Sequence, residues 1–173
     1  MPTPQQKMTA ELEREAVATR RVLERVPAEH LGWQPHPKSM TLGQLAFHVA
    51  SLPGGISRMA RLDGMDVAGR TGGPPQPQST EEILTTLESS LTEARALLAG
   101  LSDEQADAPW RLSAGAKEIF TLPRLDVVRT MMFNHIYHHR GQLAVYLRLL
   151  NIPVPVIYGR SADENPFADV TPA

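Results

Sequence analysis

Residues 124–152, RLDVVRTMMFNHIYHHRGQLAVYLRLLNI, decide the fold class, because they contain no proline and repeat with the period of a helix. Every third or fourth position falls on one face: Leu125, Val128, Met132, His135, His139, Gln142, Tyr146 and Leu149. This spacing is typical of an amphipathic α-helix that turns one face toward a core. We therefore expect a long helix over 124–152 with two of its histidines pointing inward.

Three further windows that are suited to helices carry the same periodicity, at 5–26, 38–52 and 78–108. The second begins near Ser39 or Thr41, either of which can cap a helix, and is expected to continue past Pro53 with a kink. The third begins at Ser79, and Glu82 three residues later completes the form of a capping box. Four helices with one apolar face each bury those faces most simply against one another, so the sequence predicts an all-α four-helix bundle.

The remaining segments are expected to connect these helices or to follow them. Residues 63–78 are rich in glycine and proline, which predicts an irregular connection. Residues 109–123 favour a short hairpin or an extended crossover, and 151–173 an irregular C-terminal tail. We expect a single domain over 1–173, since a chain of 173 residues supports one core.

The composition argues against several classes of protein. A formal net charge of −2 disfavours proteins that bind nucleic acid or anionic membranes, which need a basic face. The lack of cysteine excludes disulfide frameworks, cysteine nucleophiles and thiolate metal sites. The start, MPTPQQKMTAELERE, has no apolar signal core, and every apolar stretch is too short to span a bilayer. We therefore expect a cytoplasmic protein with no membrane or nucleic-acid partner.

Three histidines are candidate metal ligands: His48, His135 and His139. His135 and His139 are four residues apart, so a helix places their imidazoles one turn apart on one face. His48 lies on the inward stripe of the second predicted helix. Three imidazoles from two facing helices are typical of catalytic zinc sites, in which the fourth position stays open. His138, three residues after His135, is the alternative ligand, but the stripe passes through His139, which we favour.

The same histidines could instead be hydrogen-bonded core residues that bind no metal. Ile136 stands where the His-Glu-x-x-His metalloproteases carry their glutamate, so that general base is absent. Asp126 is expected to serve the N-terminus of its helix and Tyr137 to lie off the inward stripe, which leaves the general base unassigned. Arg140 is expected to be a solvated surface residue; the alternative is that it binds a substrate carboxylate. His30 and His36 are predicted to be exposed loop residues.

Three runs of the sequence resemble the DinB/YfiT-like superfamily: TLGQLAFHVASLPG (41–54), NHIYHHRGQLAVYLRLLNIPVP (134–155) and YGRSADE (158–164). The resemblance covers nearly the whole chain in the right order, and Asn-His-x-x-His-His-Arg-Gly-Gln is its most specific motif. It implies a four-helix bundle, commonly a homodimer, in which His48, His135 and His139 hold one divalent ion, usually zinc or nickel. Some members of this superfamily transfer low-molecular-weight thiols, so the resemblance also implies a thiol cosubstrate.

We therefore expect a metal-dependent enzyme that activates a small thiol or water at the three-histidine site, with S-transfer to an electrophile as the leading reaction. The alternative is a non-catalytic, metal-stabilised dimeric bundle that acts as a binding or stress-response protein. The implied homodimer is favoured by apolar residues that the inward face leaves unused: Leu143, Val145 and Leu147. Residues 158–164 are expected to fold back near the metal site or the dimer interface.

Overall fold

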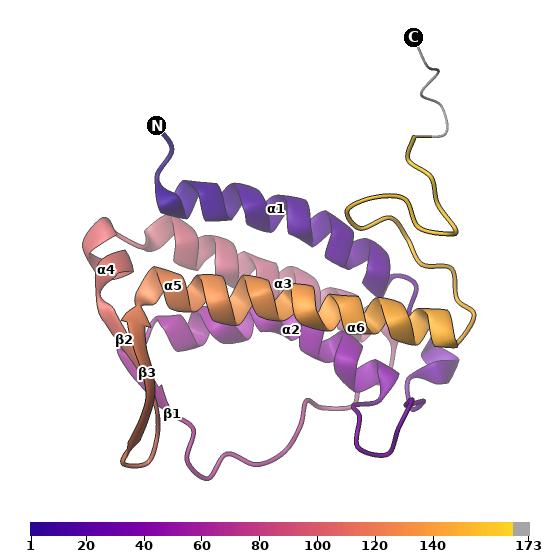
Figure 1. The fold of residues 1–173 in the computed structure, drawn as a ribbon, viewed down its shortest axis with the longest axis horizontal. Helices are drawn as coiled ribbons and strands as arrows, with labels where there is room; N and C mark the ends of the chain where they lie inside the picture. Colours follow the sequence, from indigo (N-terminus) through magenta and orange to yellow (C-terminus); the bar gives the residue numbers. More distant parts are fainter. Residues whose placement is uncertain (168–173) are drawn as a thin grey trace.

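Four long helical segments lie side by side in the computed structural model, which describes residues 1–167 (Figure 1). They are α1 (Pro4–Leu23), α2 (Leu42–Ala60), α3 (Thr80–Gly100) and a continuous rod formed by α5 (Arg124–Val128), the π-helix η2 (Arg129–Asn134) and α6 (His135–Leu149). Two short helices join them, the 3-10 helix η1 (Ala28–His30) and α4 (Asp103–Asp107). The structure is thus mostly helical, as the sequence predicts.

Side-chain caps start these helices where the sequence places them. Thr41 accepts a hydrogen bond from the backbone N–H of Gln44, whose side chain accepts from the Thr41 N–H in return, which is a complete capping box. Ser79 caps α3 by accepting from the Glu82 N–H, but the Glu82 carboxylate accepts from Gln78 instead of completing the box. The window 78–108 was expected to be one helix; it breaks after Gly100 because Leu101 is extended and Ser102 caps α4.

Helix α2 occupies the centre of the core, and it continues through Pro53 as predicted. Its backbone approaches α3 closely at Gly54, whose N–H donates a 2.6 Å hydrogen bond to the Ser90 hydroxyl. A methyl group at position 54 would lie 2.9 Å from the Ser90 Oγ and 3.0 Å from its Cα. Glycine is therefore required here to let the two helices pack at this distance.

The π-helix changes which face of the last rod is buried. Its wider i→i+5 turns use more residues per turn than an α-helix, so the inward face moves one position along the chain. The buried series is Val128, Met132, Ile136, Arg140, Leu143 and Leu147, in place of the predicted stripe through His135 and His139. Leu143 and Leu147 are consequently core residues, which corrects their assignment to a subunit interface; Val145 stays 57% exposed.

A three-stranded sheet at one end of the helices shows that the prediction of a purely all-α fold was incomplete. Strands β2 (Pro109–Ala114) and β3 (Lys117–Pro123) form the predicted hairpin, whose turn uses Gly115 at a φ of 60°. The third strand, β1 (Gly64–Asp66), pairs in parallel with β2 and lies within the connection predicted to be irregular throughout. Three residues are too few to show a strand period, so only the pairing reveals this strand.

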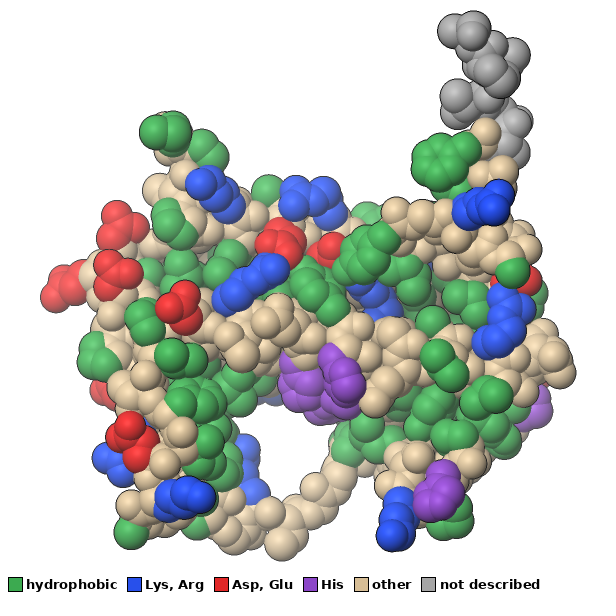
Figure 2. Space-filling model, in the orientation of Figure 1, with side chains coloured by type: hydrophobic (Ala, Val, Ile, Leu, Met, Phe, Trp, Pro, Cys, Tyr) green, Lys and Arg blue, Asp and Glu red, His purple; other side chains and the backbone are tan. Residues whose placement is uncertain are grey.

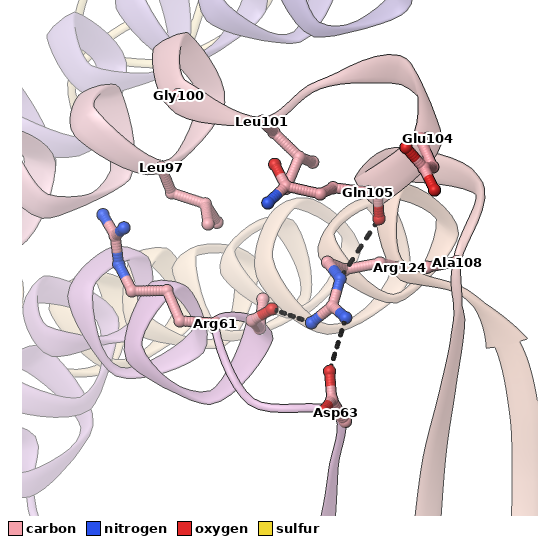
Figure 3. Close-up of a pocket in the computed structure, with 10 residues that line it drawn as sticks. Arg61, Asp63, Leu97, Gly100, Leu101, Glu104, Gln105, Ala108 and Arg124 are labelled. Atoms are coloured by element: carbon pink, nitrogen blue, oxygen red, sulfur yellow. Dashed lines mark hydrogen bonds and ion pairs between the residues drawn. The ribbon is translucent and has the colours of Figure 1, made fainter.

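A buried arginine joins the end of α2 to α4 and α5 (Figure 3). The Arg124 guanidinium donates to the backbone carbonyls of Ala60, Leu62 and Gln105, and it forms a 3.1 Å ion pair with Asp63. A hollow of about 650 Å³ lies beside it. Because these four partners occupy the guanidinium, we assign Arg124 a structural role.

The segment that follows α6 folds back on the helices, without regular secondary structure up to residue 167. Glu164 forms ion pairs with Arg21 and Arg25 of α1, and Asp163 forms one with Arg148 of α6. The expected return of 158–164 to the helices is confirmed, whereas its ion pairs reach α1 and α6 and not the histidines; a place at the dimer interface stays a prediction. The part of the predicted tail over 168–173 lies outside the described residues.

The described part of the chain contains no helix with the length and apolar character that a membrane crossing requires.

We predict opposite effects for alanine at two adjacent glycines of α2. Gly54→Ala should lower the free energy of unfolding by about 1–3 kcal/mol, because the added methyl overlaps Ser90. Gly55→Ala meets no atom within 4 Å and should be neutral or stabilising by up to about 1 kcal/mol. Urea denaturation measures both, and equal effects would contradict the close approach at Gly54.

Candidate metal centre

The structure brings together the three histidines that the sequence predicts, one from α2 and two from the N-terminal half of α6. One ring nitrogen from each of His48, His135 and His139 lies within 4.8 Å of the others. The Nε2 atoms of His48 and His135 are 3.4 Å apart, and the ring centroids of His48 and His139 are 4.7 Å apart. The four-residue spacing places His135 and His139 on the same side of α6, with centroids 4.6 Å apart.

The cluster lies at the edge of the core and not inside it. All three side chains are half-buried. For His135 and His139 the reason is the π-helix, which turns Ile136 and Arg140 into the core and these two histidines to its flank. Figure 2 shows histidine side chains gathered below α6, above a hollow that the sheet and the connection from β1 to α3 border. The site is therefore accessible to a small molecule.

One neighbouring group orients an imidazole of α6. The His139 Nδ1–H donates a 2.7 Å hydrogen bond to Oε1 of Gln142, which leaves its Nε2 lone pair free. Such outer contacts fix ring orientation at metal sites. The sequence by itself assigns no role to Gln142. Its position three residues after His139, on the same helix face, is the sequence signal for this hydrogen bond. The backbone of Met131, in the π-helix, acts on the His135 ring only by partly opposing the lowering of its pKa.

The surroundings favour neutral imidazoles. Burial, reinforced by the neighbouring His139 and His135, lowers the pKa of His48 to about 4. Burial also lowers the pKa of His135 and of His139, although the hydrogen bond to Gln142 partly opposes the effect at His139. Only a neutral imidazole can bind a metal. Three neutral nitrogen donors with their lone pairs close together therefore fit a zinc-class ion.

The other candidate residues lie outside this cluster. His138 is exposed and stacks against His139 with centroids 4.8 Å apart, but its ring is not among the three clustered groups. His30 and His36 are exposed, as predicted, and Asp126 is exposed in the first turn of α5.

Arg140 differs from both sequence interpretations, because its side chain is only 1% exposed. Its guanidinium forms a 2.7 Å ion pair with Glu15 of α1 and also donates to Thr19 and to the Tyr158 hydroxyl. A buried guanidinium charge needs a partner of opposite charge, and the Glu15 carboxylate is that partner. Tyr137 lies off the inward face as predicted, and its hydroxyl donates to Glu11 of α1. Burial and this hydrogen bond raise the pKa of Tyr137, which makes it a poor general base.

A groove of about 460 Å³ begins at the histidine cluster and is lined by both His48 and His135. Its floor consists of apolar side chains of α2, including Leu52, Ile56 and Met59, and Met65 of β1 contributes to its wall. This volume is in the range of small-molecule sites. The cluster and the groove together place three imidazole nitrogens beside a hollow with the volume of a small molecule.

Comparison with known proteins identifies the family. The model of the DinB family matches residues 1–166, which is nearly the whole chain. The chain belongs to the DinB family. This match confirms the resemblance drawn from the sequence runs 41–54, 134–155 and 158–164. The chain matches no curated protein.

Two solved DinB-like proteins share this DinB fold. A DinB-like protein from Bacillus cereus superposes with a TM-score of 0.66 at 24% sequence identity, covering 86% of this chain and 94% of its own. A DinB-like protein from Bacillus subtilis superposes with a TM-score of 0.65 at 16% identity, covering 89% of this chain and 99% of its own. Similarity at these identities concerns the fold, so the function of this DinB protein has to be argued from its own residues.

The lowered pKa values predict that the metal-free protein loses stability in acid. A histidine whose pKa is lower in the folded state binds protons more readily when unfolded, so stability is intact above about pH 6.5 and falls as the pH approaches 4. His48→Gln should remove part of this decline in the free energy of unfolding. Urea denaturation of chelator-treated protein at a series of pH values tests this, and identical declines in both proteins would contradict it.

Proposed function

We propose that this DinB-family protein binds one divalent metal ion through His48, His135 and His139, and that it is a metal-dependent enzyme acting on a small thiol or water. The observation that carries the proposal is the cluster itself, with three neutral imidazoles whose ligand atoms lie within 4.8 Å at the end of an open groove. Zinc and nickel are the metals we favour, because both accept imidazole nitrogen.

The proposed reaction is transfer of a low-molecular-weight thiol to an electrophilic carbon: the thiol loses its proton to water, its sulfur forms the new S–C bond, and the bond from that carbon to its leaving group breaks. A bound zinc-class ion supplies Lewis acidity, which lowers the pKa of a thiol or water toward neutrality. The protein's own residues hold the site: Gln142 orients the His139 imidazole, and the apolar groove displaces water from the substrate. Since the chain contains no cysteine, the thiol has to be a cosubstrate.

The alternative is that the metal only stabilises the fold. His48 lies on α2 and the other two ligands on α6, so one ion would link two helices that otherwise meet through side-chain packing. In this case the protein would be a non-catalytic binding or stress-response protein. We favour the enzyme because the groove opens directly at the cluster, whereas a structural zinc site is closed by four protein ligands.

We also propose that the protein is a homodimer. Leu143 and Leu147 are buried and so are not available to a subunit interface. The proposal is supported by the family resemblance and by two exposed apolar residues of α6, Val145 and Leu149. Each of these is 57% exposed, and four residues separate them, so they form one stripe on the outer side of the helix.

Metal content tests the ligand assignment. His48→Ala, His135→Ala and His139→Ala should each lower bound zinc or nickel steeply, because each removes a direct ligand. Gln142→Ala should weaken affinity by about 10- to 100-fold, as loss of an orienting partner does. His138→Ala is the matched control and should retain most of the metal. Mass-spectrometric metal analysis after loading and dialysis measures this, and retention in His139→Ala with loss in His138→Ala would contradict the assignment.

Thiol consumption separates the enzyme from the alternative. We expect the metal-loaded protein to consume a small thiol in the presence of an electrophile, and the chelated protein or His139→Ala to lose this activity. The loss follows because the thiol would keep its ordinary pKa and remain mostly protonated at neutral pH. Metal binding without turnover across a panel of thiols and electrophiles would favour the non-catalytic alternative.

A further inference from the structure

The groove beside the histidines has an arginine at its edge that the proposed chemistry does not use. Two arginines line the groove, Arg58 of α2 and Arg70 of the connection that follows β1. Among the described residues, no aspartate or glutamate lines it. The groove therefore combines an apolar floor, a metal-ligand cluster and a positively charged rim.

The two arginines differ in their partners. Arg58 donates to the Glu93 carboxylate at 2.5 Å, so its charge is already balanced. Within the described residues, the Arg70 guanidinium forms no ion pair, and its one hydrogen bond is the 3.4 Å approach of Nη1 to the sulfur of Met65. A thioether sulfur is a weak acceptor and leaves the guanidinium charge uncompensated. Arg70 is thus the groove's available cation.

The sheet places Arg70 at the groove. The Val67 N–H donates to the Ser113 carbonyl at 2.8 Å, which continues the β1–β2 pairing beyond Asp66. The chain then turns, with the Arg70 N–H donating to the Val67 carbonyl at 3.2 Å and Gly69 at a φ of 73°. A positive φ at this position favours glycine, so the turn depends on Gly69.

A second contact secures the turn. One carboxylate oxygen of Asp66 accepts hydrogen bonds from the N–H groups of Ala68 at 2.8 Å and of Gly115 at 2.9 Å. Gly115 belongs to the turn between β2 and β3, so the hairpin holds the start of the connection. Arg70 therefore emerges from a turn bonded to the sheet, and its side chain returns toward Met65 of β1.

We infer that Arg70 binds the carboxylate of a small amphipathic substrate whose apolar body lies on Leu52, Ile56 and Met59 and whose reacting end faces His48 and His135. A single guanidinium matches one carboxylate in charge and in its paired hydrogen bonds. The apolar floor selects against ligands that carry charge along their length. This substrate class rests on the proposed function for its reacting end, but the carboxylate site itself does not require a metal.

The test uses two probes with the same apolar body, 3-phenylpropanoate and 3-phenylpropanamide, titrated by calorimetry into the chelator-treated full chain. Removing metal prevents the carboxylate from binding through the ion. The wild-type protein should bind the carboxylate at least about 10-fold more tightly than the amide, as a charge-assisted hydrogen bond provides. Acetate, which lacks the apolar body, should bind more weakly than 3-phenylpropanoate.

Two substitutions with the same change of charge locate the site. Arg70→Gln should bring the affinities for carboxylate and amide to within about 2-fold of each other while leaving amide binding unchanged. Arg61→Gln is the matched control, because Arg61 is also an exposed arginine but lines the separate hollow beside Arg124. It should keep the wild-type preference. Gly69→Ala should reduce the preference by displacing Arg70, with the thermal unfolding of the protein confirming that it remains folded.

The outcomes separate this inference from the proposed function. Absence of a carboxylate preference in the wild type, absence of any binding, or equal effects of Arg70→Gln and Arg61→Gln would overturn the inference. Carboxylate preference in a protein that retains neither zinc nor nickel would support Arg70 and refute the metal centre. Zinc retention without the preference would leave the metal centre standing and refute the role of Arg70.

Discussion

The close packing of α2 against α3 at Gly54 is the contact on which the arrangement of the site depends. The Ser90 hydroxyl accepts from the Gly54 N–H, and the lack of a side chain at position 54 lets the two backbones meet. Helix α2 carries His48 and the floor of the groove, and its end leads directly into β1. Anything that shifts α2 outward would therefore move the histidine, the floor and the strand together.

The π-helix keeps the α6 histidines accessible. Had the rod stayed α-helical, the stripe through Met132 would have continued to His135 and turned both imidazoles toward the core. The wider turn directs Ile136 inward instead, and the imidazoles of His135 and His139 come to the flank, half-buried beside the groove. This position lowers their pKa values without closing them off from a ligand.

The small sheet brings to the groove two side chains that the helices do not supply. A helix exposes side chains along its own axis, whereas β1 and the turn after it extend across the end of α2 and place Met65 and Arg70 against the groove. The buried Arg124 fixes the same region by donating to the carbonyls of Ala60, the last residue of α2, and of Leu62, just beyond the helix. One side of the groove is thus made by segments outside the four long helices, whereas its floor belongs to α2.

The sequence by itself determined the four helical segments, the cap Ser79 and the three histidines of the cluster, and it left Thr41 as one of two possible caps and the hairpin as one of two alternatives. These depend on local signals, namely periodicity, capping side chains and the i, i+4 spacing of His135 and His139. Only the tertiary structure decided which face of α6 is buried, the pairing of β1, the burial of Arg140 against Glu15 and the position of Arg70 at the groove. The physical reason is that a π turn, a three-residue strand and a buried ion pair gain their stability from distant partners, which local sequence patterns do not contain.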